Sequence, residues 1–224
     1  MRANPPNRPV LTGRELHERF RAVRGRRGGE SWRIRVHRAI SWLEQAEELP
    51  PEQQDLRFVA LWIAFNSLYG EWDRDEHQPV RDASSRRRLA ARLVDLDAPR
   101  VEWLLRGSRS TLKSVLSSRY LLADYWKDPD DEKRWTRHFE DARRLQRNLD
   151  GEQILRVLQQ TLHRLTVLRG QVFHGQSTRG SRLNRAVVRP CGQLLASFVP
   201  VFIEIVLEEG ADDEWGPVGF PPSR

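Results

Sequence analysis

The sequence predicts an all-α fold. Apolar residues recur at helical spacing along most of the chain, and no segment shows the sustained alternation of a strand bounded by turn residues. Clusters of Pro, Gly and short polar residues separate the periodic segments. A bundle of helices joined by short connections, with extra helices beyond its core, is the simplest architecture that fits these observations.

The length and composition fit one domain. The chain has 224 residues, of which 38% are hydrophobic and 31% are charged, and its 8 Trp and 8 Phe can supply a core. Both ends are rich in Pro and Gly. We therefore expect a single all-α domain over residues 14–209, with flexible tails at 1–13 and 210–224.

The chain is basic, and most of its cations are arginines. Lys and Arg number 38 against 31 acidic residues, which gives a formal net charge of +7. The guanidinium fork matches phosphate geometry, so an anionic partner is one interpretation. Ordinary solvated surfaces on an Arg-rich protein are the other, and net charge alone does not choose between them.

The chain carries few signals of export or membrane insertion. Its single cysteine, Cys191, excludes an intrachain disulfide and fits a reducing compartment. The N-terminal segment lacks the apolar core of a signal peptide. The longest apolar stretch, 194–207, is short for a bilayer and contains Pro200 and Glu204. We expect a soluble, cytoplasmic protein without a membrane partner, in which this stretch is a buried helix.

Three helices are expected in the first third of the chain. A short basic helix covers about 14–23 and ends at GRRGG. The next begins near Ser31, a favourable N-cap, and ends at Pro50. The third covers about 52–69, and its centre, FVALWIAFNSLYG, is apolar nearly all round, as in a helix at the middle of a core.

The rest of the chain is also expected to be helical. Residues 71–84 and 127–133 are polar and predict loops. Helical patterns cover 85–96, 101–107, 108–126 and 132–149, and then two longer segments, 152–173 and 182–208. The second of these contains Pro190 and Pro200, which can kink it. The connection HGQSTRGS has the length that joins antiparallel neighbours.

Several kinds of chemistry leave no trace in the sequence. There is no P-loop, GxGxxG, HExxH or GxSxG motif and no kinase motif set. His163 and His174 could share a helix face, but they would lie ~16 Å apart along its axis, too far for one metal ion. We expect neither a metal nor another cofactor.

The most informative feature is the pair Arg169 and His174 in the segment LRGQVFHG, near the end of an apolar-striped helix. Gly175 and a turn follow at once, so His174 should be accessible. On a straight helix, side chains five positions apart differ by roughly 140° around the axis, so the two are not natural partners on one face. Asn66 is an isolated amide in the earlier apolar helix, where burial would require a hydrogen-bond partner.

Together, LWIAFNSLYG in an early helix and LRGQVFHG in a late one resemble the HEPN superfamily, over roughly residues 31–208. That family is all-α, built on a four- or five-helix bundle, and its signature is an Arg followed, after four to six residues, by a His late in the fold. Arg169 and His174 match its shortest form. Many members carry a polar residue directly after the Arg, whereas this chain has Gly170.

The resemblance implies a metal-independent endoribonuclease from a toxin–antitoxin, phage-defence or RNA-processing system. It also implies a homodimer in which Arg and His from each subunit form one composite site. Histidine can take a proton from the RNA 2′-OH or give one to the leaving oxygen, and arginine can hold the phosphate. A cognate antitoxin or defence-system protein would be a further partner.

Further residues are weaker candidates. Asn66 could support the site or satisfy a core backbone group, and Tyr69 and Trp72 are expected to be packing residues. His174 could instead cap its helix, and Arg169 could be an ordinary surface residue. The alternative to catalysis is a module that binds RNA, a nucleotide or a protein, or a structural accessory of a larger complex. Basic residues that could contact an RNA backbone are Arg164, Arg179, Arg182 and Arg185, with a second cluster at Arg86, Arg87 and Arg88.

Overall fold

The computed structural model describes residues 9–147, 152–176, 178 and 182–219. For residues 141–147, 152 and 182–185 it describes the backbone alone. Within these residues the regular secondary structure is helical apart from two strands of two residues each. The expected all-α class is therefore confirmed.

The first three helices form close to where the sequence placed them. Helix α1 covers Gly13–Val23, and Thr12 with Glu15 forms its capping box. Helix α2 covers Glu30–Glu48 and is capped by Gly29, so the expected N-cap at Ser31 is wrong. Helix α3 covers Gln54–Tyr69, and the amide of Gly70 closes it on the carbonyl of Asn66.

The connection after α3 contains a small strand pair. Strand β1, Trp72–Asp73, pairs antiparallel with β2, Gln78–Pro79. The tight turn between them places His77 at a φ of 51°, in the left-handed region. This short ladder is too brief to be read from an alternating pattern.

The middle of the chain is more broken than expected. Helix α4, Asp82–Gly107, is kinked at Asp97, two residues before Pro99, which agrees with two helical segments. The single helix expected over 108–126 is divided into α5, Arg109–Leu116, the 3-10 turn η1, Arg119–Leu121, and α6, Ala123–Lys127. Helix α7 covers Glu132–Arg147.

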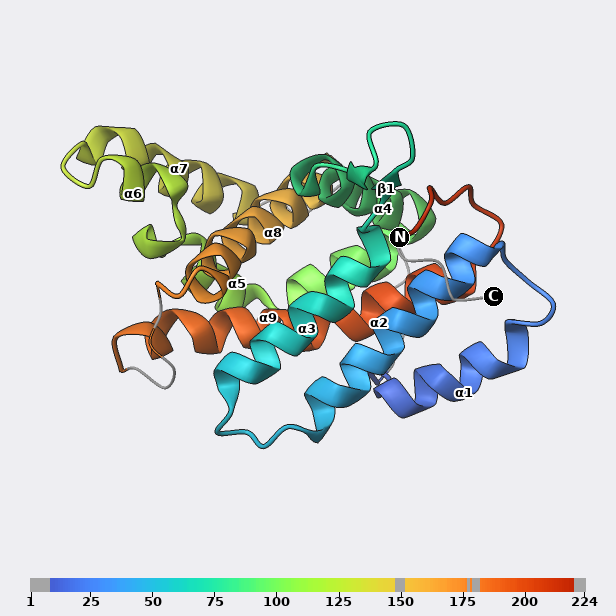
Figure 1. Ribbon diagram of the computed structural model, residues 1–224. Helices are drawn as coiled ribbons and strands as arrows, with labels where there is room; N and C mark the ends of the chain where they lie inside the picture. Colours follow the sequence, from blue (N-terminus) through green and yellow to red (C-terminus); the bar gives the residue numbers. More distant parts are fainter. Residues whose placement is uncertain (1–8, 148–151, 177, 179–181, 220–224) are drawn as a thin grey trace.

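The last two helices complete the bundle. Helix α8 covers Glu152–Phe173, and α9 covers Arg182–Glu209. Figure 1 shows α9 running along the bundle beside α2, α3 and α8, with α6 and α7 forming a lobe at one edge. Among the described residues, α9 alone is long and apolar enough to cross a membrane, but 72% of its apolar window is buried inside the protein, as in a core helix.

Aromatic side chains join α3 and α2 to α9. The ring of Phe65 lies 4.9 Å from that of Tyr69 and 6.0 Å from that of Phe202. Trp32 is fully buried, and its indole Nε1 donates a 2.9 Å hydrogen bond to the carbonyl of Val206. Removing a buried indole of this kind typically costs about 3–5 kcal/mol.

The C-terminal segment is not the free tail that its composition predicted. Buried Arg35 donates a 2.8 Å hydrogen bond to the carbonyl of Gly216, and the guanidinium of Arg92 lies 4.3 Å from the ring of Trp215. Residues 210–219 are therefore docked on α2 and α4. At the other end, Leu11 is buried, so the domain begins before residue 14. Residues 1–8 and 220–224 lie outside the described residues.

Candidate functional site

The end of α8 is set by a glycine. His174 donates its backbone N–H to the carbonyl of Gly170 at 3.0 Å, which continues the helical pattern. Gly175 then adopts a φ of +68°, a conformation that favours glycine. The amides of Gly175 and Gln176 return to the carbonyls of Val172 and Gln171, at 3.3 and 2.9 Å, as in a Schellman cap. The sequence LRGQVFHG therefore places His174 at the C-terminal end of α8.

Arg169 is half-buried and carries an unneutralised charge. Its guanidinium carbon lies 4.9 Å from the centre of the Phe173 ring, one helical turn further on. Its Nε is buried without a hydrogen-bond partner. Among the described residues, no carboxylate lies within ion-pair distance of this guanidinium. Such a cation can receive a phosphate without first giving up a protein partner.

His174 lies at the C-cap of α8 and is exposed. Its imidazole makes no hydrogen bond to any described residue. Arg169 shares its helix face with Phe173 and not with His174, in agreement with the five-residue spacing. One chain thus presents the two groups on different sides of the same helix end, and the structure does not bring them together.

A polar network that the sequence analysis missed lies beside Arg169. The buried hydroxyl of Tyr69 donates to Oδ1 of Asp82 at 2.7 Å, and Arg86 donates to Oδ2 of the same carboxylate at 2.6 Å. Burial raises the pKa of Tyr69, and the charge of Asp82 raises it further. The positive charges of Arg86 and Arg169 oppose this rise, so both guanidinium groups act at the Tyr69 hydroxyl.

This network corrects one expectation and qualifies another. Tyr69 packs in the core, as expected, but its hydroxyl also joins α3 to α4 next to Arg169. The triplet of arginines starting at Arg86 does not form one basic surface. Arg86 is buried against Asp82, while exposed Arg88 pairs with Glu71. The local sequence signal was the i,i+4 spacing of Asp82 and Arg86.

Asn66 is exposed, which contradicts the expected buried amide. Helix α3 is apolar nearly all round, so its sequence does not reveal which face is left uncovered. Asn66 lies on that uncovered face, and its backbone carbonyl accepts a hydrogen bond from the backbone N–H of Gly70. The amide side chain therefore needs no core partner, and nothing in its contacts ties it to Arg169.

Arg164 is buried, with 5% of its surface exposed, so it is not the surface phosphate contact that we expected. Its Nε has no hydrogen-bond partner, and burial lowers the pKa of its guanidinium to about 10. Neighbouring His163 keeps an exposed edge. Loss of solvent around the ring, followed by the charges of Arg86 and Arg164, lowers the pKa of His163.

The other residues expected to contact an RNA backbone are Arg179, Arg182 and Arg185. Arg179 lies outside the described residues. Arg182 and Arg185 belong to the first turn of α9, and their side chains lie outside the described part of the chain. A surface pocket of about 400 Å³ lies elsewhere, against Trp72 and Pro217, and contains none of the expected site residues.

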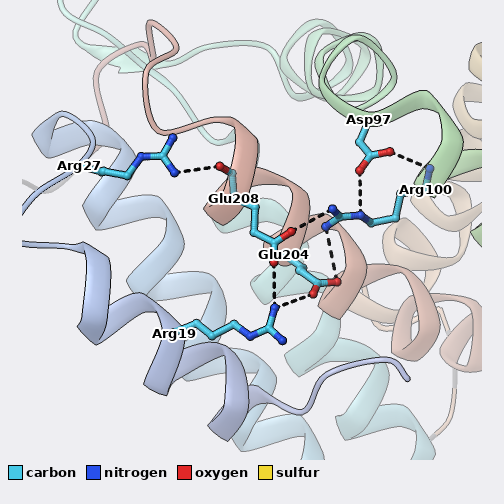
Figure 2. Close-up of polar contacts among 6 residues, drawn as sticks. All are labelled: Arg19, Arg27, Asp97, Arg100, Glu204 and Glu208. Atoms are coloured by element: carbon cyan, nitrogen blue, oxygen red, sulfur yellow. Dashed lines mark hydrogen bonds and ion pairs between the residues drawn. The ribbon is translucent and has the colours of Figure 1, made fainter. Parts of the chain in front are cut away.

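A second cluster of arginines, at the far end of α9, has the opposite character. Figure 2 shows Arg19 and Arg100 converging on Glu204 and Glu208. Arg19 donates to Glu204 at 3.0 Å and to Glu208 at 2.8 Å, and Arg100 donates to Glu208 at 2.9 Å. Asp97, at the α4 kink, completes the set through a 2.9 Å ion pair with Arg100. These groups hold α1, α4 and α9 together, and because three carboxylates face two arginines, neither arginine is left without an acidic partner.

Neither metal ligands nor relatives add to this site. No three His, Cys, Asp or Glu side chains are grouped for a metal ion within the described part of the chain. The chain matches no protein-family model, no curated protein and no solved structure.

Proposed function

We propose that this protein is a metal-independent endoribonuclease of HEPN type that cleaves RNA by attack of the 2′-OH. The observation that carries the proposal is the unneutralised Arg169 guanidinium, held against Phe173 one turn before the exposed His174. A cation without a carboxylate partner and an accessible imidazole are the two groups that phosphate transesterification requires. The resemblance of LRGQVFHG and LWIAFNSLYG to HEPN motifs supports the same reaction.

In the proposed reaction, a histidine takes the proton of the 2′-OH and the 2′-oxygen attacks the adjacent phosphorus. The bond from phosphorus to the 5′-oxygen breaks, and a protonated histidine gives that oxygen its proton. Arg169 stabilises the charge that builds on the phosphoryl oxygens. The products are a 2′,3′-cyclic phosphate and a 5′-hydroxyl.

A homodimer would resolve the geometry of the pair. Within one chain, Arg169 and His174 lie on different sides of the helix end, so the two side chains cannot easily contact the same phosphate. Two α8 helices facing each other would supply Arg169 and His174 from both subunits. We therefore propose a composite site, formed in the cytoplasm by two copies of the chain. A toxin or phage-defence setting, with an antitoxin or defence protein as partner, rests on the HEPN resemblance alone.

The test is incubation of labelled total RNA and tRNA with purified protein in EDTA. We expect cleavage by the wild type, with cyclic-phosphate ends, and none by Arg169→Ala or His174→Ala. Matched controls are Arg14→Ala, an exposed arginine on α1, and His77→Asn in the exposed β1–β2 turn, where asparagine accepts the positive φ. Both controls should cleave normally. Full cleavage by both site variants would overturn the proposal.

The second candidate is a non-catalytic module that binds RNA, a nucleotide or a protein. The separation of Arg169 from His174 within one chain favours it, because a bare arginine alone suffices for phosphate binding. It predicts saturable binding that depends on Arg169 but not on His174, with no cleavage at any protein concentration. The nuclease instead predicts activity per chain that rises with concentration as dimers form.

A further inference from the structure

We propose that an exposed aromatic patch beside the end of α8 stacks unpaired bases, and that the substrate is single-stranded RNA. The patch is formed by Tyr120 and Trp126, with Arg119 at its edge. The proposal rests on the proposed function for the identity of the reaction. The base-binding role itself rests on exposure, ring contacts and charge.

Two exposed aromatic residues lie next to each other. Tyr120 and Trp126 are 42% and 56% exposed, and their ring centres lie 6.3 Å apart. Tyr120 belongs to η1, and Figure 1 shows the η1–α6 segment beside the C-terminal end of α8. The Nε2 of Gln171 donates a 3.0 Å hydrogen bond to the Tyr120 carbonyl, which ties this segment to the C-terminal end of α8.

The rings of Tyr120 and Trp126 are held in place by neighbouring aromatic side chains and by a hydrogen bond. Tyr125 lies 5.6 Å from Tyr120 and 5.4 Å from Trp126, and its other neighbour is the buried Trp135 at 5.7 Å. The indole of Trp126 also donates a 2.9 Å hydrogen bond to the Tyr120 carbonyl, the same oxygen that Gln171 uses. Rings ordered in this way lose little conformational freedom when a base stacks on them.

A cation beside the rings favours a nucleic acid over an apolar protein surface. The guanidinium of exposed Arg119 lies 5.1 Å from the Tyr120 ring and 5.5 Å from the Tyr125 ring. No described carboxylate lies within ion-pair distance of Arg119. The nearest acidic residue in sequence, Asp124, is already engaged by His138, Lys127 and Arg134. Aromatic faces beside a guanidinium group that has no carboxylate partner can bind single strands, through stacking and phosphate contacts.

The test uses a short single-stranded RNA with 2′-O-methyl groups, which binds but cannot be cleaved because its nucleophile is blocked. Its dissociation constant is measured for the wild type, Tyr120→Ala and Trp126→Ala. We expect each substitution to weaken binding by about ten-fold, the loss of one stacked base. Trp126→Phe, which keeps a ring but loses the indole hydrogen bond, should bind more tightly than Trp126→Ala. The matched control is Trp42→Ala, a tryptophan of 39% exposure on α2, which should bind as the wild type does.

The outcomes separate this proposal from the nuclease proposal. Equal binding by the wild type and the patch variants, or equal binding of the same sequence as a duplex, would overturn the stacking role even if the wild type cleaves RNA. Loss of a dimer in Trp126→Ala, seen by light scattering with oligonucleotide binding unchanged, would assign the patch to a protein interface and overturn it too. Binding that depends on Trp126 in a protein that cleaves nothing would support the patch and count against the nuclease.

Discussion

The two ends of this helical bundle use arginine in opposite ways. At the end formed by α1, α4 and α9, Arg19 and Arg100 are neutralised by Glu204 and Glu208. At the end of α8, the guanidinium of Arg169 faces an aromatic ring and no described carboxylate. The first arrangement holds helices together, and both of its cations already face carboxylates. The second leaves a positive charge available, which is a feature that stability alone does not explain.

The largest effect that would test this comparison is the removal of Glu204. Only 5% of its side chain is exposed, and Arg100 is 16% exposed, so Glu204→Ala leaves partly buried cations with one carboxylate fewer. Loss of one partner from a buried pair typically costs about 3–5 kcal/mol, and we expect about 2–3 kcal/mol here because Glu208 remains. Urea denaturation measures this loss.

The matched control for that measurement is Glu18→Ala. Glu18 also pairs with an arginine, Arg14, but both side chains are highly exposed. Exposed pairs of this kind contribute about 0.5 kcal/mol or less. If Glu204→Ala lost no more stability than Glu18→Ala, the network in Figure 2 would not be the structural tie that its geometry indicates.

The second prediction concerns Arg164, the buried arginine of α8. Its guanidinium has no carboxylate at ion-pair distance among the described residues, and its Nε has no partner. An apolar side chain of similar length should therefore be accepted or preferred, so Arg164→Met should raise the free energy of unfolding by about 1 kcal/mol. The measurement is urea denaturation in phosphate-free buffer. A loss of more than 1 kcal/mol would contradict the view of Arg164 as an uncompensated cation.

The contrast between these arginines could not be read from the sequence. All of them are followed or preceded by apolar helical residues, and whether one is paired depends on which helices pack against it. The sequence did predict the helical class, the break at Gly175 and the separation of Arg169 from His174, because these depend on local spacing and on glycine. It failed for Asn66 and for the docked C-terminal segment. In the latter, buried Arg35 binds backbone carbonyls, which leave no mark on a sequence.

The third prediction uses the two glycines that flank the site. An added Cβ at Gly170 meets nothing within 4 Å, so Gly170→Ala should stabilise helix α8 by about 0.5–1 kcal/mol. Gly175 also has space around it, but its φ is +68°, so Gly175→Ala should destabilise by about 1 kcal/mol. Thermal unfolding of both variants checks the opposite signs, and equal signs would contradict the capped helix end.

The same Gly170 variant sharpens the proposed dimer. An added Cβ at Gly170 meets nothing within one chain. If the site were formed by a single chain, Gly170→Ala should therefore leave RNA cleavage unchanged. If two α8 helices approach closely at this point, the added methyl groups should weaken the dimer and lower RNA cleavage while each subunit becomes more stable. Light scattering and the cleavage assay on one preparation measure both effects. Full dimerisation and full cleavage by Gly170→Ala would exclude a close α8–α8 approach at this residue.

The smallest expected effect is a pH dependence that arises at His163. Partial burial and the charges of Arg86 and Arg164 lower its pKa, whereas Asp124 has a weak opposing effect. Since the unfolded chain then binds a proton more readily than the folded one, the free energy of unfolding should fall as pH drops below about 6.5, the ordinary histidine value. The contribution should stay below about 1 kcal/mol because the ring keeps an exposed edge. Urea denaturation of the wild type and His163→Gln between pH 5 and 8 isolates it. As the pH falls, the free energy of unfolding should decrease less for the variant than for the wild type. A larger decrease for the variant would mean that the fold favours the protonated form of His163, contrary to the lowered pKa.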